Sequence, residues 1–202
     1  MRAAPFAAFI VLLAAFPHSP WLRGIAAAAL LALFWRHYTE LRESRLSTRQ
    51  AAIAIAVGVA VFLAWIALDQ PWARFGGQGA GYAPLTAEGA IDWPRAMARF
   101  AILAAVVPVM EELFWRSFLM RWIDRRDFLG LEPRRVSATA VILASGLFAL
   151  EHSLWVAGLI AGLAYAVLYM TTNNLRAPVV AHAVTNAILG SWILATGSWH
   201  LW

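Results

Sequence analysis

The chain has 202 residues, of which 62% are hydrophobic, and its mean hydropathy is +0.67. Soluble domains contain about 45–50% apolar residues, so this composition excludes a soluble globular protein and indicates an integral membrane protein. The formal net charge is +5, but all 16 basic residues are arginines in short segments between apolar runs, which indicates topology signals and no nucleic-acid partner. The absence of cysteine excludes disulfides, thiolate nucleophiles and cysteine-ligated metals.

Seven apolar runs follow one another along the chain, and a spanning helix needs about 20 residues. They cover residues 4–16, 21–37, 51–69, 96–120, 136–151, 153–172 and 177–198. The first run resembles a signal peptide, but Pro17-His18-Ser19-Pro20 lacks a small-residue cleavage site, so we expect a short, uncleaved helix. The predicted fold class is therefore all-α, a polytopic transmembrane helix bundle of about seven spans in a single domain, 1–202.

Two arginine-rich segments predict how the bundle is oriented. One follows the second run and the other follows the fourth; they contain Arg36, Arg42, Arg45 and Arg49, and Arg121, Arg125, Arg126, Arg134 and Arg135. The positive-inside rule places both segments and the N-terminus in the cytoplasm and the C-terminus outside. Residues 69–93, with Gly76, Gly77, Gly79, Gly81 and Pro84, predict an irregular loop on the opposite side. The arginine- and alanine-rich composition fits a GC-rich bacterial genome, so we expect a multi-pass protein of the bacterial inner membrane.

The fourth run carries two adjacent carboxylates, Glu111 and Glu112, followed by Arg116. We expect its helix to begin after Pro94 and to continue past Pro108 with at most a kink. Adjacent helical residues point about 100° apart, and Glu112 precedes Arg116 by the four residues that favour an ion pair. Two interpretations remain: both carboxylates neutralise Arg116, or Glu112 does so alone and Glu111 is a reactive carboxylate.

Two later helices add further polar groups to apolar sequence. Phe148 and His152 share a face at the end of the fifth run, and His182 and Asn186 share a stripe of the seventh. An ionisable group near a bilayer centre costs about 2.5–3.5 kcal/mol even on lenient scales, so the set favours a hydrolytic constellation over a structural one. In ideal helices His152 would lie near the outer end of its span, whereas His182 would lie near the inner end of its own.

The two histidines can meet only if the fifth span is tilted, short or set deep, or if the chain near 153–155 folds back into the protein. We therefore predict a polar cavity enclosed by the fourth, fifth and seventh helices. Glu151, beside His152, is a second acid, a gate or an interfacial residue, and these alternatives stay open. Gly158 and Gly162 form a Gly-x-x-x-Gly pair that favours close helix packing over a substrate groove.

Three ordered motifs carry a resemblance to a known family. They are Glu-Glu-x-x-x-Arg, then Phe-x-x-x-His, then Asn-Leu-x-Ala-Pro-x-x-x-His-x-x-x-Asn, on successive membrane helices. This order resembles the CAAX proteases and bacteriocin-processing enzymes, which include the type II CAAX prenyl endopeptidases, over about residues 95–198. The N-terminal half, with Tyr38-Thr39-Glu40-Leu41 after the second run, resembles the bacterial subgroup called CAAX prenyl protease-related, which is associated with exosortase systems. The resemblance implies that residues 94–202 form the catalytic core and that residues 1–93 form N-terminal helices and a loop.

The resemblance implies an intramembrane endopeptidase of the glutamate type. Glu111 and His152 would then hold and deprotonate the attacking water, and His182 and Asn186 would stabilise the tetrahedral oxyanion. Glu112, Arg116 and Phe148 would provide structural support. No metal is favoured, because the chain lacks the His-Glu-x-x-His motif of zinc proteases; the alternative is zinc held by Glu111, His152 and His182.

The resemblance leaves the substrate open. Bacteria are not expected to prenylate CAAX boxes, so we expect cleavage of an unprenylated membrane protein or exported peptide near one of its ends. The partners are then that substrate and the lipid bilayer. The competing class is a non-catalytic membrane scaffold or immunity protein of the same fold. A transporter is a third option, but the two halves show no paired broken helices.

Overall fold

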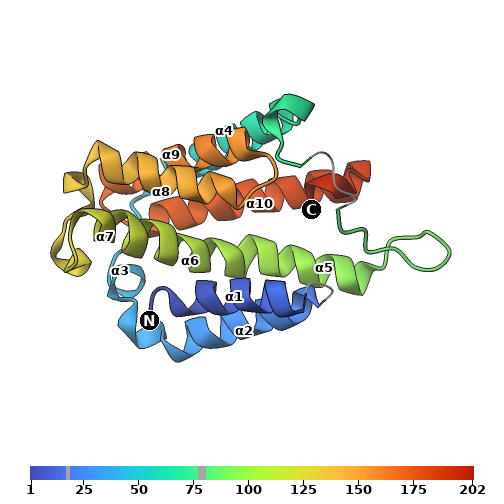
Figure 1. The fold of residues 1–202 in the computed structure, drawn as a ribbon, viewed down its shortest axis with the longest axis horizontal. Helices are drawn as coiled ribbons and strands as arrows, with labels where there is room; N and C mark the ends of the chain where they lie inside the picture. Colours follow the sequence, from blue (N-terminus) through green and yellow to red (C-terminus); the bar gives the residue numbers. More distant parts are fainter. Residues whose placement is uncertain (17–18, 77–80) are drawn as a thin grey trace.

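The computed structural model describes residues 1–16, 19–76 and 81–202, which form a bundle of helices (Figure 1). Apart from one isolated bridge between Leu85 and Ile91, the regular structure within these residues is helical, as predicted. Its α-helices are α1 Ala4–Ala15, α2 Pro20–Leu33, α3 Thr39–Arg42, α4 Thr48–Ala67, α5 Trp93–Ala101, α6 Val107–Glu112, α7 Met120–Asp124, α8 Ala138–Leu150, α9 Trp155–Thr172 and α10 Arg176–Thr196. Each apolar run of the sequence is thus largely helical.

Helices α5, α6 and α7 are parts of one long helix that runs through the middle of the bundle (Figure 1). The paired helices α1 and α2 lie on one side of it, and α4, α8, α9 and α10 lie on the other. The π-helical turns Ile102–Val106 and Leu113–Leu119 connect its three parts. The long helix begins at Trp93, one residue before Pro94 and not after it, because the Asp92 side chain accepts a hydrogen bond from the Arg95 amide and caps the helix.

Glycines allow the helices around the long helix to approach closely. A Cβ atom on Gly58 of α4 would lie 2.4 Å from the carbonyl oxygen of Ala181 on α10. On α9, a Cβ on Gly158 would lie 3.1 Å from the Cα of Ala149, and one on Gly162 would lie 3.0 Å from the Cβ of Ser145. The Gly-x-x-x-Gly pair therefore serves close packing of α9 on α8, as predicted.

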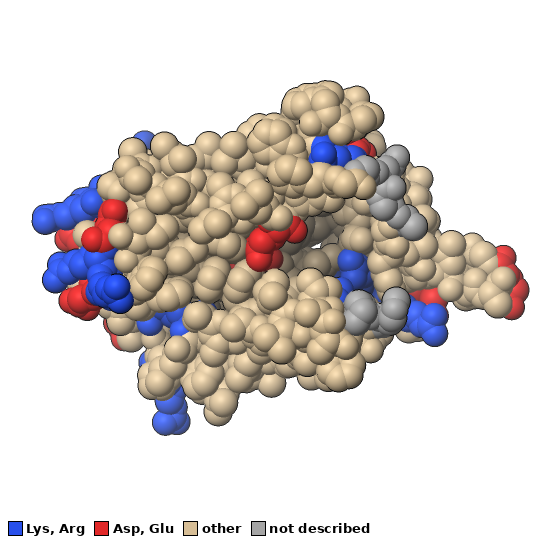
Figure 2. Space-filling view, viewed as in Figure 1, with Lys and Arg blue, Asp and Glu red and all other residues tan. Residues whose placement is uncertain are grey.

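Within the residues that the structure describes, three helices are long and apolar enough to cross a bilayer: Thr48–Ala67, Trp155–Thr172 and Arg176–Thr196. The apolar helices Ala4–Ala15, Pro20–Leu33 and Ala138–Leu150 are shorter. Figure 2 shows a broad surface with little charge along the length of the molecule, interrupted by an acidic side chain near its middle, with most of the visible basic side chains gathered at the end near α3 and α7. This arrangement is that of a membrane protein with one strongly cationic end.

Glu40 joins the elements at this cationic end. Its carboxylate accepts hydrogen bonds from Arg2 at 2.9 Å, Arg121 at 2.7 Å, Ser117 at 2.6 Å and Tyr169 at 2.8 Å. Burial raises the pKa of Glu40, but Arg121, Ser117 and Arg2 lower it by more, so its pKa lies below the ordinary value. The Tyr-Thr-Glu-Leu segment therefore ties the N-terminus and α3 to the long helix and α9.

The segment 69–93 is irregular, as predicted, where the structure describes it. The short 3-10 turn Pro71–Ala73 follows α4, and the Phe75 amide donates to the Ser153 carbonyl at 2.8 Å. Asp69 pairs with Arg74 and accepts a hydrogen bond from His200 at 2.8 Å, which holds this segment against the C-terminus. Two parts of the chain lie outside the described residues. They are residues 77–80, which carry part of the predicted glycine-rich loop, and residues 17–18, which belong to the segment where we expect no signal-peptide cleavage.

Candidate active site

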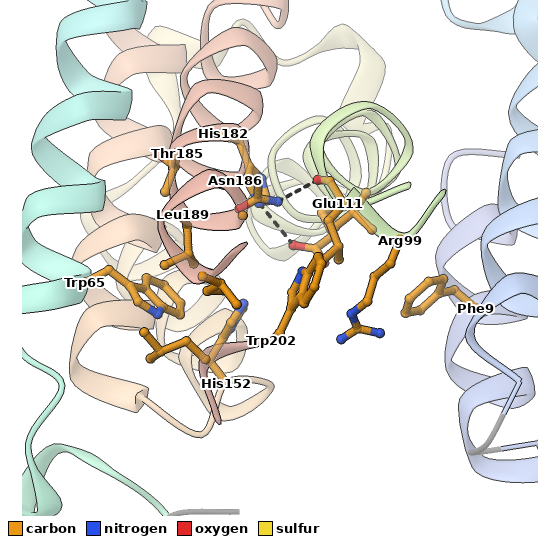
Figure 3. A pocket seen from close by; sticks show the side chains of 15 residues that line it. Phe9, Trp65, Arg99, Glu111, His152, His182, Thr185, Asn186, Leu189 and Trp202 are labelled. Carbon is orange, nitrogen blue, oxygen red and sulfur yellow. Dashed lines mark hydrogen bonds and ion pairs between the residues drawn. The ribbon is translucent and has the colours of Figure 1, made fainter. Parts of the chain in front are cut away.

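A cavity of about 220 Å³ lies between α10 and the long helix, toward the end of the molecule that has few arginines. Its polar or charged lining residues are Arg99, Glu111, His152, His182, Thr185 and Asn186. Figure 3 shows Trp65 and His152 on one side of the cavity and Arg99 on the other, with Glu111 between them. Because Phe9 of α1 and the C-terminal Trp202 also line it, the cavity has more walls than the fourth, fifth and seventh helices alone.

Glu112 is fully buried and already has two partners. Its Oε1 atom accepts a hydrogen bond from Arg116 Nη1 at 3.1 Å and lies 2.9 Å from His182 Nδ1. Arg116 also donates to the Gly162 carbonyl at 3.2 Å, and its guanidinium lies over the ring of Phe148, 4.5 Å from the centroid. Glu112, Arg116 and Phe148 thus form one buried cluster that connects the long helix with α8, α9 and α10.

Glu111 points in a different direction, into the cavity. Its Oε2 atom is buried and has no hydrogen-bond partner among the described protein atoms. This atom lies 3.9 Å from His182 Nε2. Glu112 Oε2 is also buried without a partner, so the two carboxylates differ in another respect: Glu112 binds Arg116 and His182 through Oε1, whereas Glu111 lines the cavity.

His182 is held between the two carboxylates by the bonds around it. An ionised carboxylate can only accept, so the contact with Glu112 requires His182 Nδ1 to carry the proton, and Nε2 is then directed at Glu111. The Tyr165 ring stacks on the imidazole with centroids 5.1 Å apart. The Tyr165 hydroxyl donates to Thr185 at 2.7 Å, and Thr185 donates to the Gly58 carbonyl at 2.9 Å. The ring orientation is thus fixed from three helices.

His152 reaches the same cavity because α8 is short. The helix has 13 residues and is about 20 Å long, so it ends at Leu150 and the chain turns back before α9 begins. The His152 Nδ1 atom lies 2.8 Å from the Phe148 carbonyl, which can only accept, so Nδ1 is the donor and Nε2 carries the lone pair in the neutral ring. Trp65 packs edge-on against the ring at 5.3 Å. Glu151 is exposed and does not line the cavity.

Asn186 is positioned by an irregularity of the long helix. Proline has no backbone N–H, so in the π-helical register Pro108 leaves the carbonyl of Leu103, five residues earlier, without its helical donor. The Asn186 Nδ2 atom donates to this Leu103 carbonyl at 2.8 Å. Pro108 therefore does more than kink the helix, because it frees the acceptor that orients Asn186 beside the cavity.

Sequence reasoning missed several residues of this site. Tyr165, Thr185 and Gly58 support His182 from α9, α10 and α4, and only the i, i+3 spacing of Thr185 after His182 could have indicated any of them. Arg99 precedes Glu111 on the long helix and lines the cavity, and its only sequence signal was a charge within an apolar run.

The alternative of a zinc site has little support in the positions of the donors. Among the described residues, no group of three or more His, Cys, Asp or Glu side chains is placed to hold a metal ion. His182 keeps Nε2 free for the cavity, as a metal-ligating histidine would, but the side chains of Glu111, His152 and His182 are not gathered into such a group.

These features define the chain as an all-helical membrane protein with glutamate, histidine and asparagine side chains around one internal cavity. Residues 93–188 match the family model described as type II CAAX prenyl endopeptidase Rce1-like, so this part of the chain is a domain of that protease family. The matched region contains all three motifs on which the resemblance was based, and the family prediction is confirmed. Comparisons with the curated proteins and with the solved structures found no match to the chain.

Proposed function

We propose that the protein is an intramembrane endopeptidase in which Glu111 activates the attacking water. The observation that carries this proposal is the Glu111 Oε2 atom, which is buried and unpartnered 3.9 Å from His182 Nε2 in the cavity. This separation is too long for a hydrogen bond, but a single water about 2.8 Å from each atom fits between them. Glu111 accepts the proton of that water as its oxygen attacks the substrate carbonyl.

His152 is proposed to hold the same water together with Glu111 and then to take up from Glu111 the proton that this water releases. The bond from Nδ1 to the Phe148 carbonyl leaves Nε2 as an acceptor in the neutral ring, which is the form that a base requires. His152 then returns this proton to the amine of the cleaved peptide bond, so that the leaving group departs neutral.

The oxyanion of the tetrahedral intermediate is proposed to accept hydrogen bonds from His182 and Asn186. His182 Nδ1 already donates to Glu112, so Nε2 donates only from the imidazolium form, whose positive charge Glu112 balances. Asn186 uses one amide N–H for Leu103 and has a second available. Removing one such donor typically costs about 2.7–4 kcal/mol of transition-state stabilisation. This scheme uses protein groups alone, and we propose that it requires no metal.

We propose that seven helical segments cross the bilayer, with the cationic end in the cytoplasm. The arginine segments after α2 and within 121–135 lie at that end, which supports a cytoplasmic N-terminus in a bacterial inner membrane. The cavity is lined by Trp202 and by Arg99 near the start of the long helix, so it lies toward the outer side. This position favours an unprenylated membrane protein or exported peptide as substrate.

The proposal is tested by comparing the protein termini in host membranes that carry the wild type, Glu111→Gln or His182→Ala at matched expression, using mass spectrometry. Glu43→Gln is the matched control, because Glu43 is an exposed carboxylate outside the cavity. We expect new termini with the wild type and the control and none with the two cavity variants. Identical terminal profiles in all four strains would favour a non-catalytic scaffold.

A further inference from the structure

Two half-buried arginines near the cavity, Arg23 and Arg99, have no acidic partner among the described residues, in contrast to the more deeply buried arginines. Arg116 pairs with Glu112, Arg2 and Arg121 pair with Glu40, and Arg74 pairs with Asp69. Arg23 and Arg99 form no ion pair, and the buried atoms Arg23 Nη1 and Arg99 Nε have no hydrogen-bond partner. Residues 17–18 and 77–80 contain no acid, so their sequence offers no counterion either.

The two arginines line neighbouring cavities. Arg99 lines the large cavity together with Glu111, and it also lines a smaller cavity of about 140 Å³ with Arg23. Phe9 and Leu103 border both cavities, which places the smaller one directly beside the larger. Figure 2 shows the hollow on this face with an acidic side chain at one edge and a basic side chain at another.

Aromatic rings, and no carboxylate, fix the direction of these arginines. The Arg99 guanidinium lies 4.7 Å from the ring centroid of Tyr82 and 5.6 Å from that of Trp202. Arg23 lies over the ring of Phe9 at 5.5 Å. Stacking leaves the in-plane N–H groups free to donate, and two like charges held together in a partly buried site require an anion to offset their repulsion and desolvation.

From this arrangement we infer that Arg99 and Arg23 form a subsite that binds a carboxylate of the peptide substrate, either its C-terminus or an acidic side chain. The inference rests on the proposed function, because it assigns the anion to the chain that Glu111 would cleave. A guanidinium can bind a carboxylate, as it can a phosphate, through two parallel hydrogen bonds. A peptide is favoured over a lipid phosphate because Arg99 lines the cavity that holds Glu111 and its Nε atom is buried there.

The helix also limits how far this carboxylate can be from the scissile bond. Arg99 and Glu111 are 12 positions apart on one helix, which is about 18 Å at 1.5 Å per residue. An extended peptide covers about 3.3 Å per residue, so the bound carboxylate belongs to a residue within roughly five or six positions of the cleaved bond.

Binding of fluorescent peptides tests the inference without requiring cleavage. The probes are a labelled hexapeptide of alanine and leucine with a free C-terminus, the same peptide as a C-terminal amide, and the amide with glutamate as its last residue. The protein is the Glu111→Gln form in nanodiscs of phosphatidylcholine, and fluorescence polarisation gives the affinity. Arg99→Met is combined with this background, and Arg95→Met is the matched control, because Arg95 is exposed and paired with Asp92.

We expect at least one carboxylate peptide to bind about tenfold or more tightly than the neutral amide, and Arg99→Met to abolish this difference while Arg95→Met retains it. The free-terminus and glutamate probes distinguish the two sources of the carboxylate. Equal affinities of all three peptides for the Glu111→Gln protein would overturn the inference, as would a preference that survives Arg99→Met. Loss of the preference when phosphatidylglycerol is added would instead assign the subsite to a lipid phosphate. Because no probe is cleaved, a negative result in this binding assay counts only against the carboxylate subsite. The absence of new protein termini in host membranes counts against the proposed endopeptidase.

Discussion

Replacing Glu112 with glutamine is expected to destabilise the fold far more than the same change at the neighbouring Glu111. The substitution keeps the size of the side chain but removes the charge that faces Arg116 at 3.1 Å and His182 at 2.9 Å. Glu112 is 0% exposed and Arg116 is 2% exposed, so water cannot replace the lost carboxylate. The variant therefore leaves a buried guanidinium without its counterion.

The size of the effect follows from what Arg116 retains. Removing one partner of a buried ion pair typically costs about 3–5 kcal/mol. Arg116 keeps its hydrogen bond to Gly162 and its contacts with Phe148 and Tyr165, so we expect a loss near the lower end, about 3 kcal/mol. Since whole domains are stable by only about 5–15 kcal/mol, this loss should lower the folded yield visibly.

Glu111→Gln provides the matched comparison on the adjacent residue. The Glu111 Oε2 atom is buried without a partner, so neutralising it removes an unpaired charge and should leave the free energy of unfolding unchanged or higher. Denaturant unfolding of the purified proteins in one detergent, followed by tryptophan fluorescence, measures both variants. A stability of Glu112→Gln equal to that of the wild type, or an equal loss in Glu111→Gln, would refute the assignment of structural and reactive carboxylates.

Three further predictions concern packing, pH and metal dependence. Gly58→Ala should cost about 1–3 kcal/mol in thermal unfolding, because its Cβ would lie 2.4 Å from the Ala181 carbonyl oxygen. Gly146→Ala, inside α8 and with no atom within 4 Å of its Cβ, should instead stabilise the protein by up to about 1 kcal/mol. The folded-state pKa of Glu40 lies below its ordinary value of 4.5, so the stability that Glu40 contributes is present above that pH and is lost on acidification. Glu40→Gln should remove this part of the pH dependence, which acid unfolding followed by circular dichroism measures. Extensive dialysis against a chelator should leave proteolysis unchanged; loss of activity that zinc restores would favour the ligand set Glu111, His152 and His182.

The positions of the helices and the local ion pair could be predicted because both depend on residues close together in the chain. Apolar runs mark the helical segments, and the four-residue spacing alone brings Glu112 within reach of Arg116, which it contacts at 3.1 Å. The order of three motifs identified the protease family over residues that the family model also covers. Composition likewise indicated a membrane protein, because burial in lipid requires apolar side chains over whole helices.

The sequence could not show which distant groups complete each motif. Glu112 contacts His182, 70 positions away, and Glu40 contacts Tyr169, 129 positions away, and no local spacing encodes either pair. Ideal spanning helices would place His152 and His182 at different depths, but both reach the cavity because α8 ends after 13 residues. The apolar sequence does not show where this helix ends.

The sequence by itself determined the helical membrane class, the protease family and the candidate groups, since these follow from composition, periodicity and motif order. Only the tertiary structure decided how those groups are used. Packing across α4, α9 and α10 orients His182, and the π-helical turn before Pro108 frees the Leu103 carbonyl that Asn186 binds. The same packing leaves Arg23 and Arg99 without acidic partners beside the cavity. The physical reason is that a side chain's partners depend on which helices meet, and that is set by the shapes of all their surfaces together.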